Sequence, residues 1–343
     1  MLAVVKDRKG PGYSLKEVER PKIGSEDVLI RVKAVGICGT DVPILKGIRE
    51  VPIPLIPGHE FAGLIEEVGS DVTNFAIGER VTPGLVIGCG ECSYCRRGEE
   101  NICDSIEETG IHVDGAFAEF VRVPAKVVHR IPEGVSFEEA ASVDPLASAY
   151  HPVRLANVRS SDTAVVFGAG PIGLYATQVL KAEGARKVIL VDIASGQDRL
   201  ELGAQLGADV ILVSDENIVQ KILEANDNMP ADIVVECTGN VYVLDTTIQV
   251  VRKNGTLLLV GIFHEDARAD VAKIVRNELK IFGSICYTYL DYAECLALIQ
   301  SGKIKTDPLI SHRFPLNKID DAFAAINNNE TIKVMLYPDR SEL

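Results

Sequence analysis

The chain has 343 residues, a formal net charge of −14, and 47% hydrophobic and 24% charged residues. This composition is globular, the length favours two domains, and the negative charge argues against a nucleic-acid partner, whose phosphates demand a basic face. No apolar run approaches the roughly 20 residues needed to cross a bilayer, and the opening MLAVVKDRKG has no apolar signal region. We therefore expect a cytoplasmic protein with no membrane partner.

The first 150 residues are rich in Gly and Pro and contain short apolar runs, such as VLIRVKAVGI (28–37) and EFVRVPAKVV (119–128). Short strands between turn residues have this pattern. We therefore expect an all-β lobe in this part of the chain.

Four cysteines lie within fifteen residues, in the segment GCGECSYCRRGEENIC: Cys89, Cys92, Cys95 and Cys103. Thiolates at such short spacing wrap around a soft cation, and four of them complete the tetrahedron that Zn²⁺ prefers. Disulfides would need an oxidising compartment, and a bacterial iron–sulfur cluster would need a shorter last gap followed by Pro, where Asp104 stands. The spacing therefore predicts a structural zinc site with no open ligand position.

After Ser160, compact apolar runs alternate with helical patterns. The expected strands are 163–170, 187–193, 209–213, 231–239 and 255–262. The expected helices are 171–185, 197–208, 216–226 and 241–255. Strands buried on both faces that alternate with helices predict an α/β doubly wound parallel sheet. In the tail after about residue 286, a helix at 292–302 and a strand at 332–338 are expected to return to the first lobe.

A glycine-rich turn follows the first strand of this second region. Gly168, Gly170 and Gly173, with Pro171 and Ile172 between the last two, match the pattern G-x-G-x-x-G at the start of a helix. The first Gly allows the tight turn, the second lets a pyrophosphate approach the backbone, and the third lets helix pack on strand. The helix N-terminus then offers free N–H groups to the phosphates. The turn therefore predicts a dinucleotide site.

An acidic residue stands where such a site would hold the adenosine ribose. Asp192 ends the strand KVILVD, nineteen residues past Gly173. A carboxylate here would bind the ribose hydroxyls and repel a 2′-phosphate, which favours NAD over NADP. Alternatively, Arg199 could determine the cofactor preference, because a nearby arginine could bind the 2′-phosphate of NADP.

The segment 58–72, GHEFAGLIEEVGSDV, matches GHE-x2-G-x5-G-x2-V, the zinc signature of one enzyme family, at every fixed position. Together with ICGTD (37–41), the four cysteines, GAGPIG and HRFPLNKIDDAF, it makes nearly the whole chain resemble the zinc-containing medium-chain dehydrogenases. That family includes alcohol, polyol and threonine dehydrogenases. The resemblance implies a mostly-β GroES-like catalytic domain around a Rossmann domain. The implied domains are 1–152 with 286–343, which includes a structural zinc lobe at about 88–104, and 153–285 for NAD.

The resemblance also implies a second, catalytic zinc in each chain. Cys38 and His59 should bind it, and Glu60 should bind it directly or through water. Asp144 stands in SVDPLASAYH, where alcohol dehydrogenases carry Cys and polyol dehydrogenases usually carry Glu. It is expected to be a ligand or a partner of one. An acidic, oxygen-rich site moves the chain away from simple alcohol dehydrogenases.

Zinc would lower the pKa of the substrate hydroxyl before hydride passes to the nicotinamide. Thr40 matches the family hydroxyl that accepts the alcohol proton, and Asp41 matches an acid that orients His59. The relay histidine of threonine and many alcohol dehydrogenases belongs three residues after Thr40, where Pro43 stands. This departure argues against a threonine dehydrogenase. It suggests that the proton is released through water near Glu60 or through the cofactor ribose.

By family position, the backbone of three further segments should touch the nicotinamide half of the cofactor. Their residues are Cys237, Thr238, Val260, Gly261, Ile262, Ser284 and Ile285. The histidines outside the zinc signature gain no such support, and we expect them to be surface or packing residues.

The sequence thus predicts an NAD-dependent zinc dehydrogenase acting on a secondary alcohol, either a polyol or a sugar alcohol, or on the matching ketone. Alternatives are an L-threonine 3-dehydrogenase, another secondary-alcohol or butanediol dehydrogenase, and a non-catalytic NAD-binding regulator. The family implies a homodimer or a homotetramer.

Overall fold

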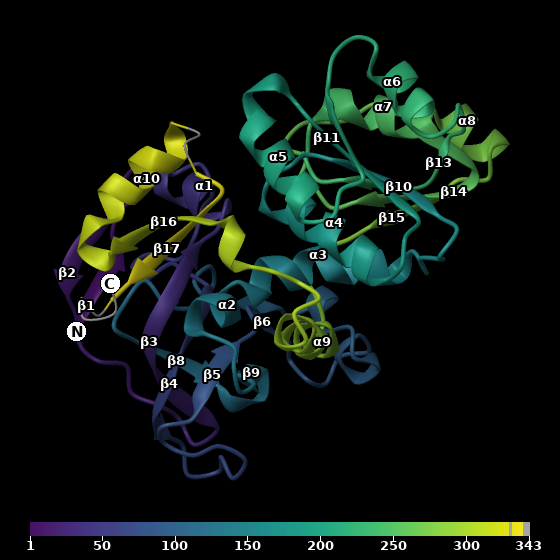
Figure 1. Ribbon diagram of the computed structural model, residues 1–343. Coiled ribbons are helices and arrows are strands. Elements are labelled where there is room, and N and C mark those ends of the chain that lie inside the picture. Colours follow the sequence, from purple (N-terminus) through teal and green to yellow (C-terminus); the bar gives the residue numbers. More distant parts are fainter. Residues whose placement is uncertain (329–330, 339–343) are drawn as a thin grey trace. The chain divides into compact units, whose positions relative to one another are not determined.

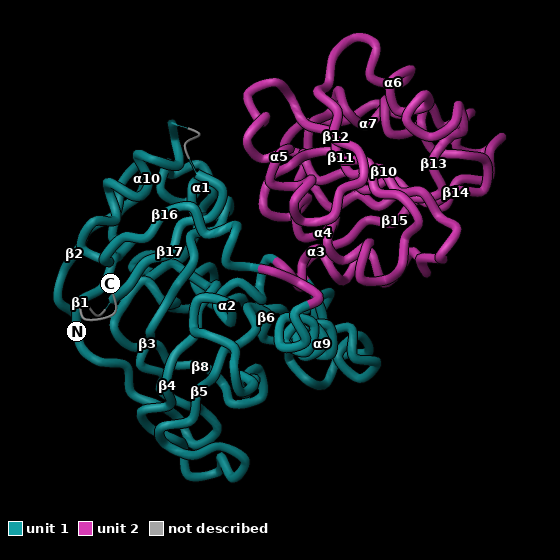
Figure 2. The backbone as a smooth tube through the Cα atoms, viewed as in Figure 1, with its two compact units in different colours: residues 1–145, 287–302, 306–343 teal, residues 146–286, 303–305 magenta. Residues whose placement is uncertain are grey.

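The computed structural model describes residues 1–328 and 331–338. The backbone divides into two compact units (Figures 1 and 2). Unit 1 contains Met1–Pro145, Tyr287–Gly302 and Thr306–Leu343, and unit 2 contains Leu146–Cys286 and Lys303–Lys305. Of the expected catalytic domain, residues 329–330 and 339–343 lie outside the described residues.

Unit 1 is built on a seven-stranded sheet in the order β16-β17-β3-β4-β5-β9, with β8 paired to β3. The strands are β3 (Asp27–Ile37), β4 (Glu60–Val68), β5 (Arg80–Pro83), β8 (Phe120–Pro124), β9 (Val128–Arg130), β16 (Ile310–Pro315) and β17 (Lys333–Tyr337). The tail therefore returns to this unit, where β17 pairs antiparallel with β3 and places Val334 opposite Ile37. The long strand β3 is almost continuously buried because it has partners along its whole length.

In the described part of unit 1, two small sheets and four α-helices accompany this sheet. The small sheets are β1 (Leu2–Val5) with β2 (Ser14–Glu17) and β6 (Val86–Ile87) with β7 (Glu107–Glu108). The helices are α1 (Asp41–Leu45), α2 (Phe137–Ala141), α9 (Tyr289–Gln300) and α10 (Ile319–Asn327).

The expectation of an all-β lobe in the first 150 residues was wrong in detail. Helix α2 forms there because Ser136 accepts from the Glu139 N–H while the Glu139 side chain accepts from the Ser136 N–H. This reciprocal cap satisfies two backbone donors at the helix start.

Unit 2 contains a six-stranded parallel sheet in the order β12-β11-β10-β13-β14-β15. The strands are β10 (Thr163–Phe167), β11 (Lys187–Asp192), β12 (Val210–Val213), β13 (Ala231–Glu236), β14 (Val251–Leu259) and β15 (Lys280–Gly283). From β10 the chain winds first toward β12 and later toward β15. Right-handed crossovers in opposite directions place helices on both faces. The prediction of an α/β doubly wound sheet is confirmed.

The helices of unit 2 connect these strands. They are α4 (Pro171–Ala182), α5 (Gln197–Gln205), α6 (Ile218–Ala225), α7 (Val241–Val250) and α8 (Val271–Arg276). A further helix, α3 (Val143–Leu155), begins in unit 1 and continues into unit 2 at Leu146. The helix expected at 241–255 ends at Val250, because Val251 is extended and pairs with Ala231 in the sheet. Within the described residues, every helix is too short or too polar to cross a membrane.

Candidate functional site

The four cysteines of the predicted structural site converge in unit 1. Their Sγ atoms all lie within 4.8 Å of one another, with Cys89–Cys95 at 3.9 Å and Cys92–Cys103 at 3.8 Å. A disulfide requires about 2.05 Å between its sulfurs, whereas a ZnS₄ tetrahedron with bonds of about 2.3 Å has edges of about 3.8 Å. The donor set therefore fits a tetrahedral zinc ion.

Backbone N–H groups already point at these sulfurs. The amides of Cys92 and Cys95 donate to the preceding cysteine of the cluster at 3.3 and 3.4 Å, and the Ser105 amide donates to Cys103 at 3.4 Å. Donors of this kind favour the thiolate, and the Cys95 amide is the main reason that the pKa of Cys92 falls to about 6. These amides favour the thiolate at Cys92, whereas burial raises the pKa of Cys95 to about 12.

A second group of possible metal ligands lies where β3 ends and β4 begins. Cys38 follows β3, His59 precedes β4, and Glu60 is the first residue of β4. The ligand atoms of these three residues all lie within 4.8 Å of one another. Antiparallel pairing, with Gly36 opposite Glu60, brings the two strand ends together. The sequence named these three residues, and the structure places them in one group.

Buried polar atoms in this group lack protein partners. His59 is 2% exposed and Glu60 is 1% exposed. His59 Nδ1 and Glu60 Oε1 have no hydrogen-bond partner among the described residues. Because an unsatisfied buried polar atom is costly, these atoms need an occupant. A thiolate, an imidazole and a carboxylate are ligands that zinc accepts, so the residues fit that metal.

Asp144 lies close enough to this group for its carboxyl to interact electrostatically with His59 and Glu60, but it is not one of the residues whose ligand atoms lie within 4.8 Å of one another. It is 4% exposed, and burial raises its pKa to about 6. The hydroxyl of Tyr287 donates a hydrogen bond to Asp144 and accepts one from the Leu85 amide at 2.9 Å. Direct contact of Asp144 with a metal stays a prediction.

A buried ion pair in unit 1 joins Glu60 to Lys333 of β17. The two side chains are 1% and 3% exposed, and the ammonium contacts Glu60 Oε2 and donates to the carbonyl of Ile37 at 3.0 Å. Burial lowers the pKa of Lys333, but the negative charges of Glu60 and Cys38 outweigh it and hold the pKa above its ordinary value. Lys333 therefore places a positive charge beside the candidate metal ligands.

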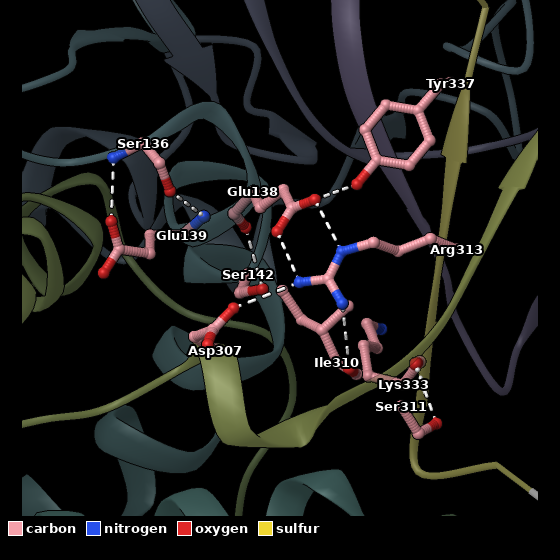
Figure 3. Close-up of polar contacts among 10 residues, drawn as sticks. All are labelled: Ser136, Glu138, Glu139, Ser142, Asp307, Ile310, Ser311, Arg313, Lys333 and Tyr337. Atoms are coloured by element: carbon pink, nitrogen blue, oxygen red, sulfur yellow. Dashed lines mark hydrogen bonds and ion pairs between the residues drawn. The ribbon is translucent and has the colours of Figure 1, made fainter. Parts of the chain in front are cut away.

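A polar network fixes the segment that leads to Asp144 (Figure 3). Arg313 of β16 forms a two-pronged ion pair with Glu138 of α2 at 2.9 and 2.8 Å, and the Tyr337 hydroxyl also donates to Glu138. Ser311 donates to the carbonyl of Lys333 at 3.1 Å. The C-terminal strands therefore anchor both α2 and the backbone that carries Lys333.

Thr40 and Asp41 lie at the start of α1. The hydroxyl of Thr40 is buried and has no hydrogen-bond partner among the described residues, so it could form a hydrogen bond to a substrate hydroxyl. Asp41 is fully buried and accepts a hydrogen bond from the Cys38 amide at 2.8 Å, while its other oxygen has no such partner in the described chain. Asp41 therefore orients the Cys38 loop, and its expected role in orienting His59 stays a prediction.

In unit 2, the glycine turn has the geometry that a pyrophosphate needs. Gly168 has φ +98°, and a Cβ on Gly173 would lie 1.7 Å from the Gly168 carbonyl oxygen. A Cβ on Gly170 would meet nothing within 4 Å, so the space in front of the helix start is open. Pro171 is the first residue of α4, and Ile172 follows it in the first turn.

Asp192 lies at the end of β11, beside this turn. Its oxygens accept from the amides of Ala169 at 3.1 Å and Ile193 at 2.8 Å, and the Arg199 guanidinium pairs with it at 3.2 Å. Asp192 and Arg199, the two residues that could determine the preference for NAD or NADP, are therefore in direct contact.

The expected nicotinamide segments meet at the carboxyl edge of the sheet in unit 2. A Cβ on Gly239 would lie 2.3 Å from the carbonyl oxygen of Ile262, and the Ser284 amide donates to Leu259 at 3.0 Å. The completely buried Glu236 links two of these segments. Its carboxylate accepts from the amides of Thr238 and Gly239 at 2.7 and 3.1 Å, and its backbone carbonyl accepts from the amides of Val260 and Gly261, both at 2.9 Å. The remaining residues predicted for this region, Cys237, Val260, Gly261 and Ile285, lie in or beside the same loops.

Sequence reasoning missed Tyr287, Lys333 and Glu236. The last two carried a signal, since each is a charged residue at the end of a mostly apolar strand, where an unpaired charge would be costly. Tyr287 carried none, because its partner Asp144 is not evident from local sequence.

Two family profiles match the chain. The family described as alcohol dehydrogenase GroES-like domain matches residues 24–133, and the zinc-binding dehydrogenase family matches residues 171–301. The chain is 35% identical to a sorbitol dehydrogenase of Halalkalibacterium halodurans, 36% to an alcohol dehydrogenase of Geobacillus stearothermophilus and 33% to an L-threonine 3-dehydrogenase of Burkholderia cenocepacia. These alignments cover 98%, 97% and 98% of this chain and 99% of each relative.

Solved structures agree with these matches. An alcohol dehydrogenase from Thermus sp. ATN1 superposes with a TM-score of 0.92 at 31% identity. A zinc-binding dehydrogenase from Sinorhizobium meliloti bound to NADP gives 0.91 at 31%, and an alcohol dehydrogenase from E. coli complexed with NADH gives 0.92 at 30%. Each comparison covers 98% of this chain and 99% of the other. The chain therefore belongs to the zinc-containing medium-chain dehydrogenase family and is an oxidoreductase of that family.

Proposed function

We propose that this protein oxidises a secondary alcohol of the polyol or sugar-alcohol class with NAD, and reduces the matching ketone. The observation that carries the proposal is the acidic character of the candidate metal site. Glu60 belongs to the candidate ligand group with Cys38 and His59. Asp144 lies near enough to interact electrostatically with Glu60 and His59. The identity with a sorbitol dehydrogenase supports the same substrate class.

In this proposal Cys38, His59 and Glu60 hold a catalytic zinc. When bound, zinc acts as a Lewis acid that lowers the pKa of the substrate hydroxyl, and the nicotinamide accepts hydride. The hydroxyl of Thr40 would take the proton of the alcohol as it gives up its own, so that it relays a proton and stays neutral. Pro43 cannot pass that proton on, so it leaves through water near Glu60 or through the cofactor ribose.

We propose NAD rather than NADP because Asp192 would repel a 2′-phosphate at the ribose. Arg199 would favour NADP only if it were released from Asp192, with which it forms an ion pair at 3.2 Å. Relatives of similar fold were solved with either cofactor. The second zinc of each chain belongs to the four-cysteine cluster, and the proposed assembly is a homodimer or a homotetramer.

L-Threonine 3-dehydrogenase and butanediol dehydrogenase are the alternative activities, and a 33% identical relative is named for the first. Pro43 argues against threonine because the expected relay histidine is missing. A non-catalytic regulator is disfavoured because Cys38, Thr40, His59 and Glu60 are all present.

The test is NADH absorbance with sorbitol, other polyols, L-threonine and butanediol in parallel. We expect the highest kcat/KM with a polyol, and a preference for L-threonine would overturn the substrate assignment. Cys38→Ser and His59→Ala should abolish turnover while NAD affinity changes little, since these residues lie in unit 1 and the glycine turn lies in unit 2. Activity that survives either change would reject the active-site assignment.

A further inference from the structure

Two acidic residues flank the glycine turn of unit 2. Strand β10 lies between β11 and β13 in the sheet, and it leads into the turn at Gly168. Asp192 is the last residue of β11, and Glu236 is the last residue of β13, where it stands opposite Phe167 of β10 in the register. A dinucleotide with its pyrophosphate on the turn and its adenosine half toward Asp192 would therefore extend its other half toward Glu236.

Close contacts between backbone loops place the Glu236 carboxylate beside this turn. A Cβ on Gly168 would lie 3.0 Å from Cγ2 of Thr238. The carboxylate accepts from the Thr238 amide at 2.7 Å, from the Thr238 hydroxyl and from the Gly239 amide at 3.1 Å. A Cβ on Gly261 would lie 2.5 Å from Glu236 Oε2, so the chain leaves no room for a side chain there. The carboxylate thus lies against both loops that are predicted to touch the nicotinamide half.

The surroundings of Glu236 fit a carboxylate that carries its charge. Its hydrogen-bond partners in the described chain are two amides and one hydroxyl, and all of them donate. A protonated carboxyl would need an acceptor for its own hydrogen. The side chain is completely buried, and no lysine, arginine or histidine among the described residues pairs with it. Asp192 differs in this respect, because the Arg199 guanidinium balances its charge at 3.2 Å.

The nicotinamide ring is the part of the cofactor whose charge changes in the proposed reaction. Hydride leaves the alcohol carbon with two electrons and bonds to the ring, while the hydroxyl proton is released and the alcohol becomes a ketone. The ring is positively charged before this step and neutral after it. Because a protein interior screens charges weakly, an unbalanced buried carboxylate would stabilise the charged ring far more than the neutral one.

On the basis of the proposed NAD site, we propose that Glu236 determines which oxidation state of the cofactor binds more tightly. Its carboxylate favours NAD⁺ over NADH, so that the protein takes up the oxidised cofactor and releases the reduced one more readily. The two acids at this edge of the sheet then have different tasks. Asp192 recognises the ribose hydroxyls, and Glu236 recognises the charge on the ring.

The test compares the affinity of the purified, zinc-loaded protein for NAD⁺ with that for benzamide adenine dinucleotide, in which an uncharged ring replaces the pyridinium. Titration calorimetry measures both, and NADH fluorescence measures the reduced cofactor. Glu236→Gln removes the charge at nearly the same shape, because its amide oxygen can take the place of Oε1 and accept from Thr238 and Gly239. Glu236→Asp keeps the charge on a shorter side chain. ADP-ribose, which has no nicotinamide ring, is the control ligand.

We expect the parent to bind NAD⁺ about tenfold more tightly than the benzamide analogue, an effect that one unit charge has on another at an effective dielectric constant of about 20. Glu236→Gln should lower this preference by about tenfold and shift the relative affinity toward NADH by a similar factor. ADP-ribose should bind Glu236→Gln and the parent equally. Glu236→Asp should bind both dinucleotides more weakly but keep the preference for NAD⁺. Equal weakening of NAD⁺ and the analogue in Glu236→Gln, as a purely structural role would produce, would overturn the proposal.

The measurement on the parent covers a failure of Glu236→Gln to fold. A parent that binds the uncharged analogue as tightly as NAD⁺ would overturn the proposal without any variant. The proposed function is tested separately by turnover of the parent. A parent that prefers the charged ring but oxidises no alcohol rejects that function alone, whereas a parent that binds neither dinucleotide rejects both.

Discussion

Tyr287 donates a hydrogen bond to Asp144, although the two residues are 143 positions apart in the sequence. The same hydroxyl accepts from the Leu85 amide at 2.9 Å, so it joins three segments of unit 1. Both side chains are buried, and the carboxyl oxygen that receives this bond is therefore fixed next to the candidate metal ligands.

Tyr287→Phe should lower the free energy of unfolding by about 1–3 kcal/mol, because it leaves a buried donor and a buried acceptor unpaired. It should also lower kcat/KM by loosening Asp144. Urea unfolding and initial rates measure the two effects. Tyr289→Phe is the control, since Tyr289 is 45% exposed, and equal stability of the two variants would contradict the prediction.

Cys92→Ser should destabilise the protein rather than change its chemistry, because a closed zinc site supplies folding energy. We expect a clearly lower melting temperature, with activity retained well below the melting range. Glu91→Gln, an exposed change on the same loop, should melt like the parent. A Cys92→Ser variant as stable as Glu91→Gln would show that the cluster holds no metal.

Asp192→Ala should lower kcat/KM with NAD and raise it with NADP. Lost hydrogen bonds to a charged group are worth about 1.5–3 kcal/mol, or about one to two orders of magnitude. Asp192→Asn removes the charge but keeps one acceptor, because Ala169 and Ile193 donate to different carboxylate oxygens and the single amide oxygen can replace only one of them. Adding Arg199→Ala should remove most of the increase in kcat/KM with NADP. A parent protein that already prefers NADP would show that Arg199, not Asp192, determines the cofactor preference.

His129 should make the protein sensitive to acid. Burial lowers the pKa of His129 from 6.5 to about 4, and the ring is stacked between Tyr289 and Tyr292 at 4.0 and 4.7 Å. Below pH 6.5 the unfolded chain binds a proton that the folded chain refuses, so stability falls as the pH falls from 6.5 toward 4. This linkage is worth about 2 kcal/mol between pH 7 and pH 5.

His129→Phe should keep the stacking and remove this part of the acid sensitivity. Urea unfolding at pH 5, 7 and 8 measures it. The loss of stability between pH 7 and pH 5 should be about 2 kcal/mol smaller in the variant, whereas pH 7 and pH 8 should not separate the two proteins. Equal losses in both would contradict the prediction.

Features set by neighbouring residues could be predicted from the sequence. The turn at Gly168 and the four cysteines depend on short spacings, and the structure has the geometry that those spacings imply. The strands of unit 2 were predictable for the same reason, since each is a continuous apolar run.

Contacts between distant segments could not be predicted. Lys333 meets Glu60 only because β17 and β4 both flank β3, and no local pattern specifies that order of strands. The end of α7 was missed for a related reason, since pairing of Val251 with Ala231 overrode a helical pattern. The relation between Asp192 and Arg199 shows the same limit, because both residues were named but their ion pair was not.

The long sequence separation between β17 and the strands β3 and β4 has a consequence for biosynthesis. A ribosome makes Cys38, His59 and Glu60 long before Lys333 and β17, which pairs with one end of β3. A nascent chain therefore exposes this edge of β3 and an uncompensated acidic ligand group until residues 333–337 have been made. Premature termination before residue 333 would leave a polypeptide that carries these three ligands but lacks the charge that balances them.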